Sequence, residues 1–122
     1  MKIALVLSCI ALLTACDNAT NKAEKFAEGV IGSNLKDPHS ARFSSLVTYR
    51  IKQGAGYADL VHVCGLVNAK NNFGGYAGNS RFVVSFLDGK QPELISKALE
   101  EPDRRTSFES VYWNDFCSEK HS

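Results

Sequence analysis

Residues 57–69 (YADLVHVCGLVNA) constrain the fold more than any other part of the chain, because apolar residues follow one another there almost without interruption. Successive side chains of a strand point to opposite faces of a sheet. One face of this segment would carry Leu60, His62, Cys64 and Leu66, and the other would carry Val61, Val63 and Val67. A strand that is apolar on both faces is typical of the centre of a sheet whose two faces are both covered. We therefore expect other elements to pack on each side of this strand.

Two further segments alternate apolar and polar residues and are predicted as strands. In residues 80–87 the core face would carry Phe82, Val84 and Phe86. In residues 41–52 one face would carry Phe43, Val47, Tyr49 and Ile51, with Ser45 as an exception. Glycine-rich connections at 54–56 and 70–78 separate the three segments, so we expect consecutive strands to run antiparallel.

Helical spacing of apolar residues marks a segment before these strands and another after them. The first segment carries Ala23, Phe26, Ala27, Val30, Ile31 and Leu35, with Asn21 and Glu24 as a capping box at its start and Pro38 at its end. The second carries Phe108, Val111, Tyr112 and Phe116, after a capping box formed by Thr106 and Glu109.

Residues 91–101 are consistent with two interpretations. Leu94, Ile95, Ala98 and Leu99 have helical spacing, whereas the preceding Asp88-Gly89 is a hairpin-type turn that favours a strand. The spacing makes a helix the slightly favoured prediction. The expected fold class is α+β, an antiparallel sheet of three or four strands with an N-terminal helix and a C-terminal helix.

Residues 1–15 have the pattern of an export signal rather than that of a folded element. Met1-Lys2 is a positive start, residues 3–11 are apolar apart from Ser8, and Leu13-Thr14-Ala15 ends the segment. The stretch is too short to cross a bilayer as a stop-transfer helix. We expect residues 1–15 to be removed, residues 16–21 to form a short tether, and residues 22–122 to form a single domain.

The junction Leu13-Thr14-Ala15-Cys16 resembles the lipobox of bacterial lipoproteins. The resemblance implies cleavage before Cys16 and lipid on its thiol, which makes the membrane a partner of a domain that faces the periplasm. Asp17 follows directly and resembles the enteric-bacterial signal for retention in the inner membrane, with the outer membrane as the alternative. An ordinary signal peptide with a chance cysteine is the alternative to lipidation.

Four cysteines are present, and the export signal accounts for two of them, since Cys9 leaves with the signal and Cys16 carries lipid. Cys64 and Cys117 remain as an even pair in an oxidising compartment, which predicts a disulfide between them. Such a bond would hold the C-terminal helix on the central strand. Two buried thiols, or one reactive thiol, are the alternatives.

The charge of the mature chain is balanced. All 13 acidic residues lie after residue 15, and Lys2 is the only base before it, so the net charge is zero with the histidines neutral. This balance argues against nucleic acid as a partner. It also argues against a polybasic attachment to anionic lipid.

Three segments of the chain together resemble a family of small uncharacterised proteins of bacteria and their prophages. These segments are Asp37-Pro38-His39-Ser40-Ala41-Arg42-Phe43, the run from Cys64-Gly65 to Gly74-Gly75-Tyr76, and a C-terminal stretch with Phe108, Trp113 and Cys117. The resemblance covers most of residues 35–117. It implies a shared fold and a shared cysteine pair, but no settled biochemical activity comes with it.

The connection between residues 68 and 78 is the candidate binding loop. Asn68, Asn71 and Asn72 are suited to closing turns with their side-chain amides, and Phe73 and Tyr76 are the aromatic residues that would anchor a partner. The alternative is a structural hairpin whose aromatics fold back on the sheet. That structural interpretation is the slightly favoured one.

Other residues of chemical interest do not form a recognisable catalytic or metal site. Asp37-Pro38-His39-Ser40 is typical of a helix end followed by a turn, and His62 with Cys64 offers too few ligands for zinc, so it is interpreted as a packed histidine beside a disulfide. The sequence also lacks a G-x-S-x-G nucleophile motif and a phosphate-binding glycine loop that opens a helix. We therefore expect no cofactor, no metal and no enzymatic activity.

The function that best fits these features is a non-enzymatic binding module at the cell envelope, with an unknown envelope or phage protein as its partner. The resemblance to prophage proteins suggests phage superinfection exclusion or protection of the envelope. An inhibitor or immunity protein against a lysozyme-like hydrolase or a secreted toxin is the alternative.

Overall fold

The computed structural model describes residues 10–71 and 73–118, with side chains from Asn18 onward. Among these residues, β1 (Arg42–Ile51), β2 (Asp59–Asn68), β3 (Ser80–Asp88) and β4 (Pro92–Leu99) form one antiparallel sheet in chain order. The helix α1 (Ile10–Gly32) precedes the sheet, and the short 3-10 helix η1 (Pro38–Ser40) joins the two. After the sheet come α2 (Arg105–Phe108), the π-helical turn η2 (Glu109–Trp113) and α3 (Asn114–Phe116), which together are called the C-terminal helical segment.

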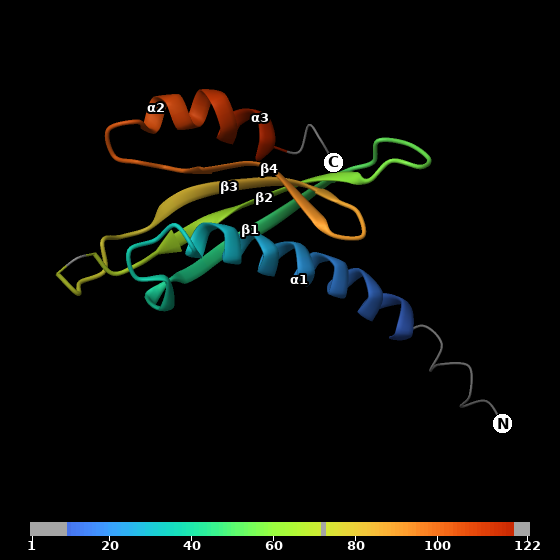
Figure 1. The fold of residues 1–122 in the computed structure, drawn as a ribbon, viewed down its shortest axis with the longest axis horizontal. Helices are drawn as coiled ribbons and strands as arrows, with labels where there is room; N and C mark the ends of the chain where they lie inside the picture. Colours follow the sequence, from blue (N-terminus) through green and yellow to red (C-terminus); the bar gives the residue numbers. More distant parts are fainter. Residues whose placement is uncertain (1–9, 72, 119–122) are drawn as a thin grey trace.

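The two helical parts cover opposite faces of the sheet (Figure 1). Side chains buried on the α1 side are Ala23, Ala27, Ile31, Val61, Val63, Val67, Phe82, Val84 and Phe86. Side chains buried on the other side are Cys64, Val83 and Phe108, with Tyr49, Ala98, Tyr112, Trp113, Phe116 and Cys117 packed around them. The predicted α+β fold is confirmed, and so is the prediction that residues 57–69 contain a central strand covered on both faces.

Gly65 shows how closely side chains of the neighbouring strands β1 and β3 pack over β2. A Cβ at this position would lie 3.0 Å from the ring of Phe82 and 3.1 Å from Leu46. These contacts are shorter than ordinary van der Waals separations, so a larger residue would push the Phe82 ring out of the core. The glycine therefore admits an aromatic ring to the α1 side of the sheet.

A β-bulge in β1 makes its side chains face differently from the prediction. The register with β2 shifts between Ser44 and Val47, and Ser45 has a positive φ of 54°. The extra residue turns the strand, so that Phe43 packs on the α1 side while Tyr49 packs beside the C-terminal helical segment. The prediction that these two residues share a face is wrong, because strict alternation fails across a bulge.

The helix favoured for residues 91–101 is also wrong, because β4 occupies most of this segment. β4 pairs with β3 through a hairpin at Asp88, and the register shifts between Ser85 and Phe86. Leu94 lies opposite Phe86 and Ala98 opposite Val83, which places them on different faces of the sheet. The apparent helical spacing therefore arises from a bulged strand. The bulge, together with Pro92 and Lys97, is typical of a strand edge protected from pairing with other chains.

Two predicted helix starts also differ from the structure. α1 begins at Ile10 and continues through residues 16–21, so Asn21 lies inside a helix and not at its cap, and the expected tether is helical. At the other end of the chain the N-cap residue is Arg104 rather than Thr106, and Glu109 binds Arg81 instead of closing a capping box. Both capping-box predictions are therefore wrong.

Candidate functional site

Two segments of the resemblance motif meet at one end of the sheet. The backbone N–H of Lys70 donates a hydrogen bond to Oγ of Ser40 at 2.9 Å, and this hydroxyl in turn donates to the carbonyl of Asp37 at 2.8 Å. The segment Asp37-Pro38-His39-Ser40 is the predicted turn, and it supports the loop between β2 and β3. Its hydroxyl is held by backbone groups, so the segment has a structural explanation rather than a catalytic one.

Asparagine side chains shape the β2–β3 loop. Oδ1 of Asn71 accepts hydrogen bonds from the N–H groups of Phe73 at 2.9 Å and Gly75 at 3.3 Å. Oδ1 of Asn68 accepts one from the N–H of Gly78 at 3.1 Å, where φ is 98°. The prediction that these amides close turns is confirmed for Asn68 and Asn71, whereas Asn72 lies outside the described residues.

The two loop aromatics differ in their environment. Phe73 is 96 % exposed, so it does not fold back on the sheet. Tyr76 is half-buried, and the guanidinium of Arg42 lies 4.1 Å from the centre of its ring. The structural interpretation of the loop therefore holds for Tyr76 and is wrong for Phe73.

A small hollow of about 170 Å³ lies beside this loop. It is lined by Leu35, Lys36, Val67, Ala69, Lys70, Asn71, Ala77, Gly78, Ser80 and Leu99. Apolar side chains therefore stand next to two lysines at the end of the sheet that carries Phe73. Another hollow, of about 330 Å³, lies between β4 and the C-terminal helical segment, and it is lined by none of the predicted site residues.

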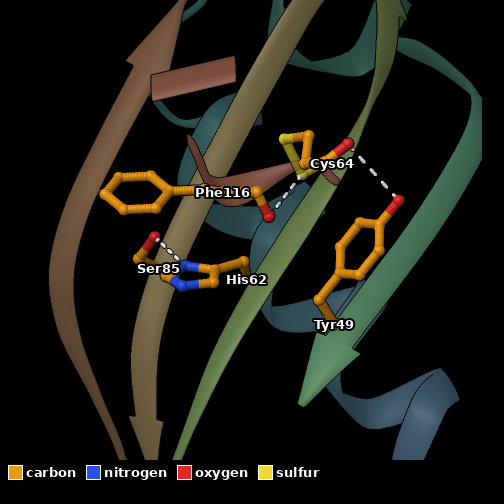
Figure 2. The surroundings of a disulfide bond; sticks show 6 residues. Tyr49, His62, Cys64, Ser85 and Phe116 are labelled. Carbon is orange, nitrogen blue, oxygen red and sulfur yellow. Dashed lines mark hydrogen bonds between the residues drawn. A yellow bond between two sulfur atoms is a disulfide. The ribbon is translucent and has the colours of Figure 1, made fainter. Parts of the chain in front are cut away.

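The predicted disulfide joins Cys64 of β2 to Cys117, with 6.0 Å between the two Cα atoms. Figure 2 shows Tyr49 on one side of this bond and His62 on the other. The Tyr49 hydroxyl donates to the carbonyl of Cys117 at 3.5 Å. The end of the C-terminal helical segment is thus held on the sheet by a covalent bond and a hydrogen bond.

His62 is a packed histidine beside the disulfide, as predicted. It is 3 % exposed, its Nδ1 is hydrogen-bonded to Oγ of Ser85 at 2.6 Å, and its ring stacks on Phe116 with the ring centres 4.5 Å apart (Figure 2). Within the described residues, no group of three or more His, Cys, Asp or Glu side chains is placed to hold a metal ion.

Arg81 is the residue whose role the sequence did not reveal. Its Nε donates a hydrogen bond to the carboxylate of Glu100 at 3.0 Å, and its Nη2 donates one to the carboxylate of Glu109 at 2.6 Å. The guanidinium also lies 5.1 Å from the ring centre of Trp113. The hydrogen bond from Arg81 lowers the pKa of the Glu100 carboxyl below its ordinary value. Arg81 therefore joins β3 and the residue after β4 to the C-terminal helical segment.

Comparison with known proteins gives no further guide to the site. No family model, curated protein or solved structure matches the chain. In the part of the chain that the structure describes, no helix is both long and apolar enough to cross a membrane.

Proposed function

We propose that this protein is a bacterial lipoprotein, anchored through lipid on Cys16, whose domain binds an envelope or phage protein through the β2–β3 loop. The anchor rests on the export-signal pattern of residues 1–15 and on the lipobox resemblance of Leu13-Thr14-Ala15-Cys16. Phage superinfection exclusion or protection of the envelope is the role that best fits a non-enzymatic module of this kind.

The exposure of Phe73 is the observation that carries the binding role. Leaving a phenylalanine side chain in water forgoes roughly 1.5–3 kcal/mol of burial free energy. The fold does not need this residue to be apolar, because its side chain is 96 % exposed. A partner that covers it would gain this free energy at the centre of a contact, as aromatic residues do in interfaces.

The position of the loop relative to the anchor also supports this role. From its N-terminal end, which would carry the proposed anchor, α1 runs to the end of the sheet that carries the β2–β3 loop (Figure 1). The part of this helix from Cys16 to Gly32 is about 25 Å long. An anchor at Cys16 would therefore leave the β2–β3 loop at the end of the domain away from the membrane that holds the protein.

Site-specific photo-crosslinking in living cells tests this proposal. The substitution Phe73→p-benzoylphenylalanine should crosslink one discrete protein on illumination. Tyr57 is the matched control, because it is 74 % exposed and lies in the turn between β1 and β2 at the opposite end of the sheet. In parallel, Phe73→Ala should weaken protection in a phage-challenge assay while Tyr57→Ala does not.

The melting temperature separates loss of binding from loss of folding. Phe73→Ala should leave it unchanged, since the side chain makes almost no buried contact. The proposal is wrong if the crosslinking patterns from positions 73 and 57 are the same. A large fall in the melting temperature of Phe73→Ala would assign the loop to the scaffold instead.

A second candidate function is inhibition of a lysozyme-like hydrolase or neutralisation of a secreted toxin. A single aromatic side chain projecting from a loop that its own asparagines hold in shape favours this candidate, because enzyme clefts are concave and largely apolar. Inhibition of purified lysozyme by the protein, relieved in Phe73→Ala, would distinguish it from the first candidate.

A further inference from the structure

We infer that the partner presents an acidic protein surface to this end of the domain, with carboxylates around an apolar socket for Phe73. This inference rests on the proposed function and adds the chemistry of the partner. It comes from the charges that surround the β2–β3 loop.

Basic residues dominate two of the three segments at this end of the sheet, residues 33–43 and 68–80. The third segment follows β4 and carries Glu100 and Glu101, whose carboxylates pair with Arg81 and Arg104. Residues 33–43 and 68–80 contain Lys36, Arg42 and Lys70 but only one acidic residue, Asp37. The chain after residue 15 has equal numbers of acidic and basic residues, so this surplus is local. A surplus of positive charge on one surface attracts partners of opposite charge and repels those of like charge.

Two of these cations, Arg42 and Lys70, are held near the loop, and within the described residues none of the three is neutralised by an ion pair. The salt bridges found there place acidic side chains on Arg50, Arg81 and Arg104 instead. The guanidinium of Arg42 rests over the Tyr76 ring, and Nζ of Lys70 lies 5.8 Å from the same ring centre. Stacking on an aromatic face fixes the position of a cation without removing its charge.

The hollow beside the loop is lined by two of these basic residues and could receive an acidic side chain of a partner. Lys36 and Lys70 line it together with the polar side chains of Asn71 and Ser80. A carboxylate entering a space of about 170 Å³ would lie beside two lysine residues while its own methylene groups contact the apolar wall. Aspartate or glutamate side chains of a protein partner fit this arrangement.

An anionic membrane fits it less well. Stable electrostatic attachment to lipid headgroups takes clusters of about four to eight basic residues. Only three, Lys36, Arg42 and Lys70, lie in the two segments here. The loop also lies at the end of the domain opposite to the start of α1 (Figure 1), so the membrane that carries the lipid anchor would be out of its reach.

Selection from a random peptide library tests the inference while the partner is still unidentified. The protein is purified in the form its host produces and used to select displayed peptides, which should be enriched in Asp and Glu beside an apolar residue. The binding of individual selected peptides is then measured at low and high salt, because attraction between exposed charges is screened by salt.

Charge-reversal variants identify the surface that these peptides use. Lys36→Glu combined with Lys70→Glu should lower their affinity by roughly tenfold or more at low salt. The matched control combines Lys52→Glu with Lys90→Glu, which makes the same change in net charge at exposed positions near the opposite end of the sheet. The control should keep the affinity of the parent, and both variants should keep its melting temperature.

The outcomes separate this inference from the proposed function. If Phe73→Ala abolishes peptide binding but the Lys36/Lys70 variant does not weaken it, the loop binds a partner whose surface is not acidic, and the inference alone fails. Neutral or basic selected peptides, or no selected peptides, would also overturn it. Binding to phosphatidylglycerol vesicles that is lost in the Lys36/Lys70 variant would assign the surface to a membrane instead.

Discussion

Removal of the Cys64–Cys117 disulfide gives a quantitative test of how the C-terminal helical segment is held. The bond joins residues that are 53 positions apart in the sequence. In the chain-entropy description, closing a loop of this length removes unfolded-state entropy worth about 4 kcal/mol at 25 °C. Domains of this size are stable by only about 5–15 kcal/mol. The disulfide therefore supplies a large fraction of the stability.

The double variant Cys64→Ala/Cys117→Ala should melt roughly 15–30 °C below the oxidised protein, since each 1 kcal/mol shifts the melting temperature of a domain this size by about 4–8 °C. Reductant should lower the melting temperature of the parent by a similar amount and leave that of the double variant unchanged. Trp113 is the single tryptophan and packs beside Cys64, so its fluorescence reports release of the segment at lower temperature.

A fall of less than about 5 °C in the double variant would refute the reasoning, because it would correspond to only about 1 kcal/mol. That result would mean that the contacts of Arg81, Phe108 and Tyr49 hold the segment without the covalent bond. Quantitative alkylation of both cysteines in the untreated parent would refute it more directly, because the disulfide would then not form in the mature protein.

Two further predictions concern pH and the anchor. Arg81 lowers the pKa of Glu100 in the folded state, so the stabilising contribution of Glu100 is present above the ordinary glutamate pKa and is lost as the pH falls through the lower folded value. On acidification, urea unfolding should therefore show that the parent loses about 1 kcal/mol more unfolding free energy than Glu100→Gln. Equal losses would contradict this. Cys16→Ser should abolish labelling by a fatty-acid analogue, whereas the parent should be labelled and, because of Asp17, should sediment with the inner membrane of an enteric host; persistent labelling of the variant would exclude lipid on this thiol.

The features that the sequence predicted correctly depend on local patterns. The apolar run of residues 57–69 identifies a strand covered on both faces, because the two faces alternate along a single segment. The Asn- and Gly-rich connection identifies a loop closed by side-chain amides, since these hydrogen bonds span at most ten residues. The prediction of the cysteine pair follows from the number of cysteines that remain once Cys9 and Cys16 are assigned to the expected export signal, and it does not depend on the fold.

The features that the sequence did not predict depend on residues far apart in the chain. The bulges at Ser45 and in β4 change which face a side chain occupies, and helical spacing then appears in a strand. Arg81 finds Glu100 and Glu109 only after β3, β4 and the C-terminal helical segment have come together. In the assembled fold Glu109 accepts a hydrogen bond from Arg81, so it does not form the capping box that local spacing predicted.

The exposed position of Phe73 could not be read from the loop sequence, and the reason bears on function. Most conspicuous polar residues at this end are used by the fold, with Ser40, Asn68 and Asn71 all bonded to backbone N–H groups. The resemblance motif therefore specifies the shape of a loop rather than a partner. A loop held in shape loses less conformational entropy on binding than a free one. Under the proposed function, we therefore expect partner recognition to be most sensitive to substitution of Phe73, which the fold leaves exposed at this end of the sheet.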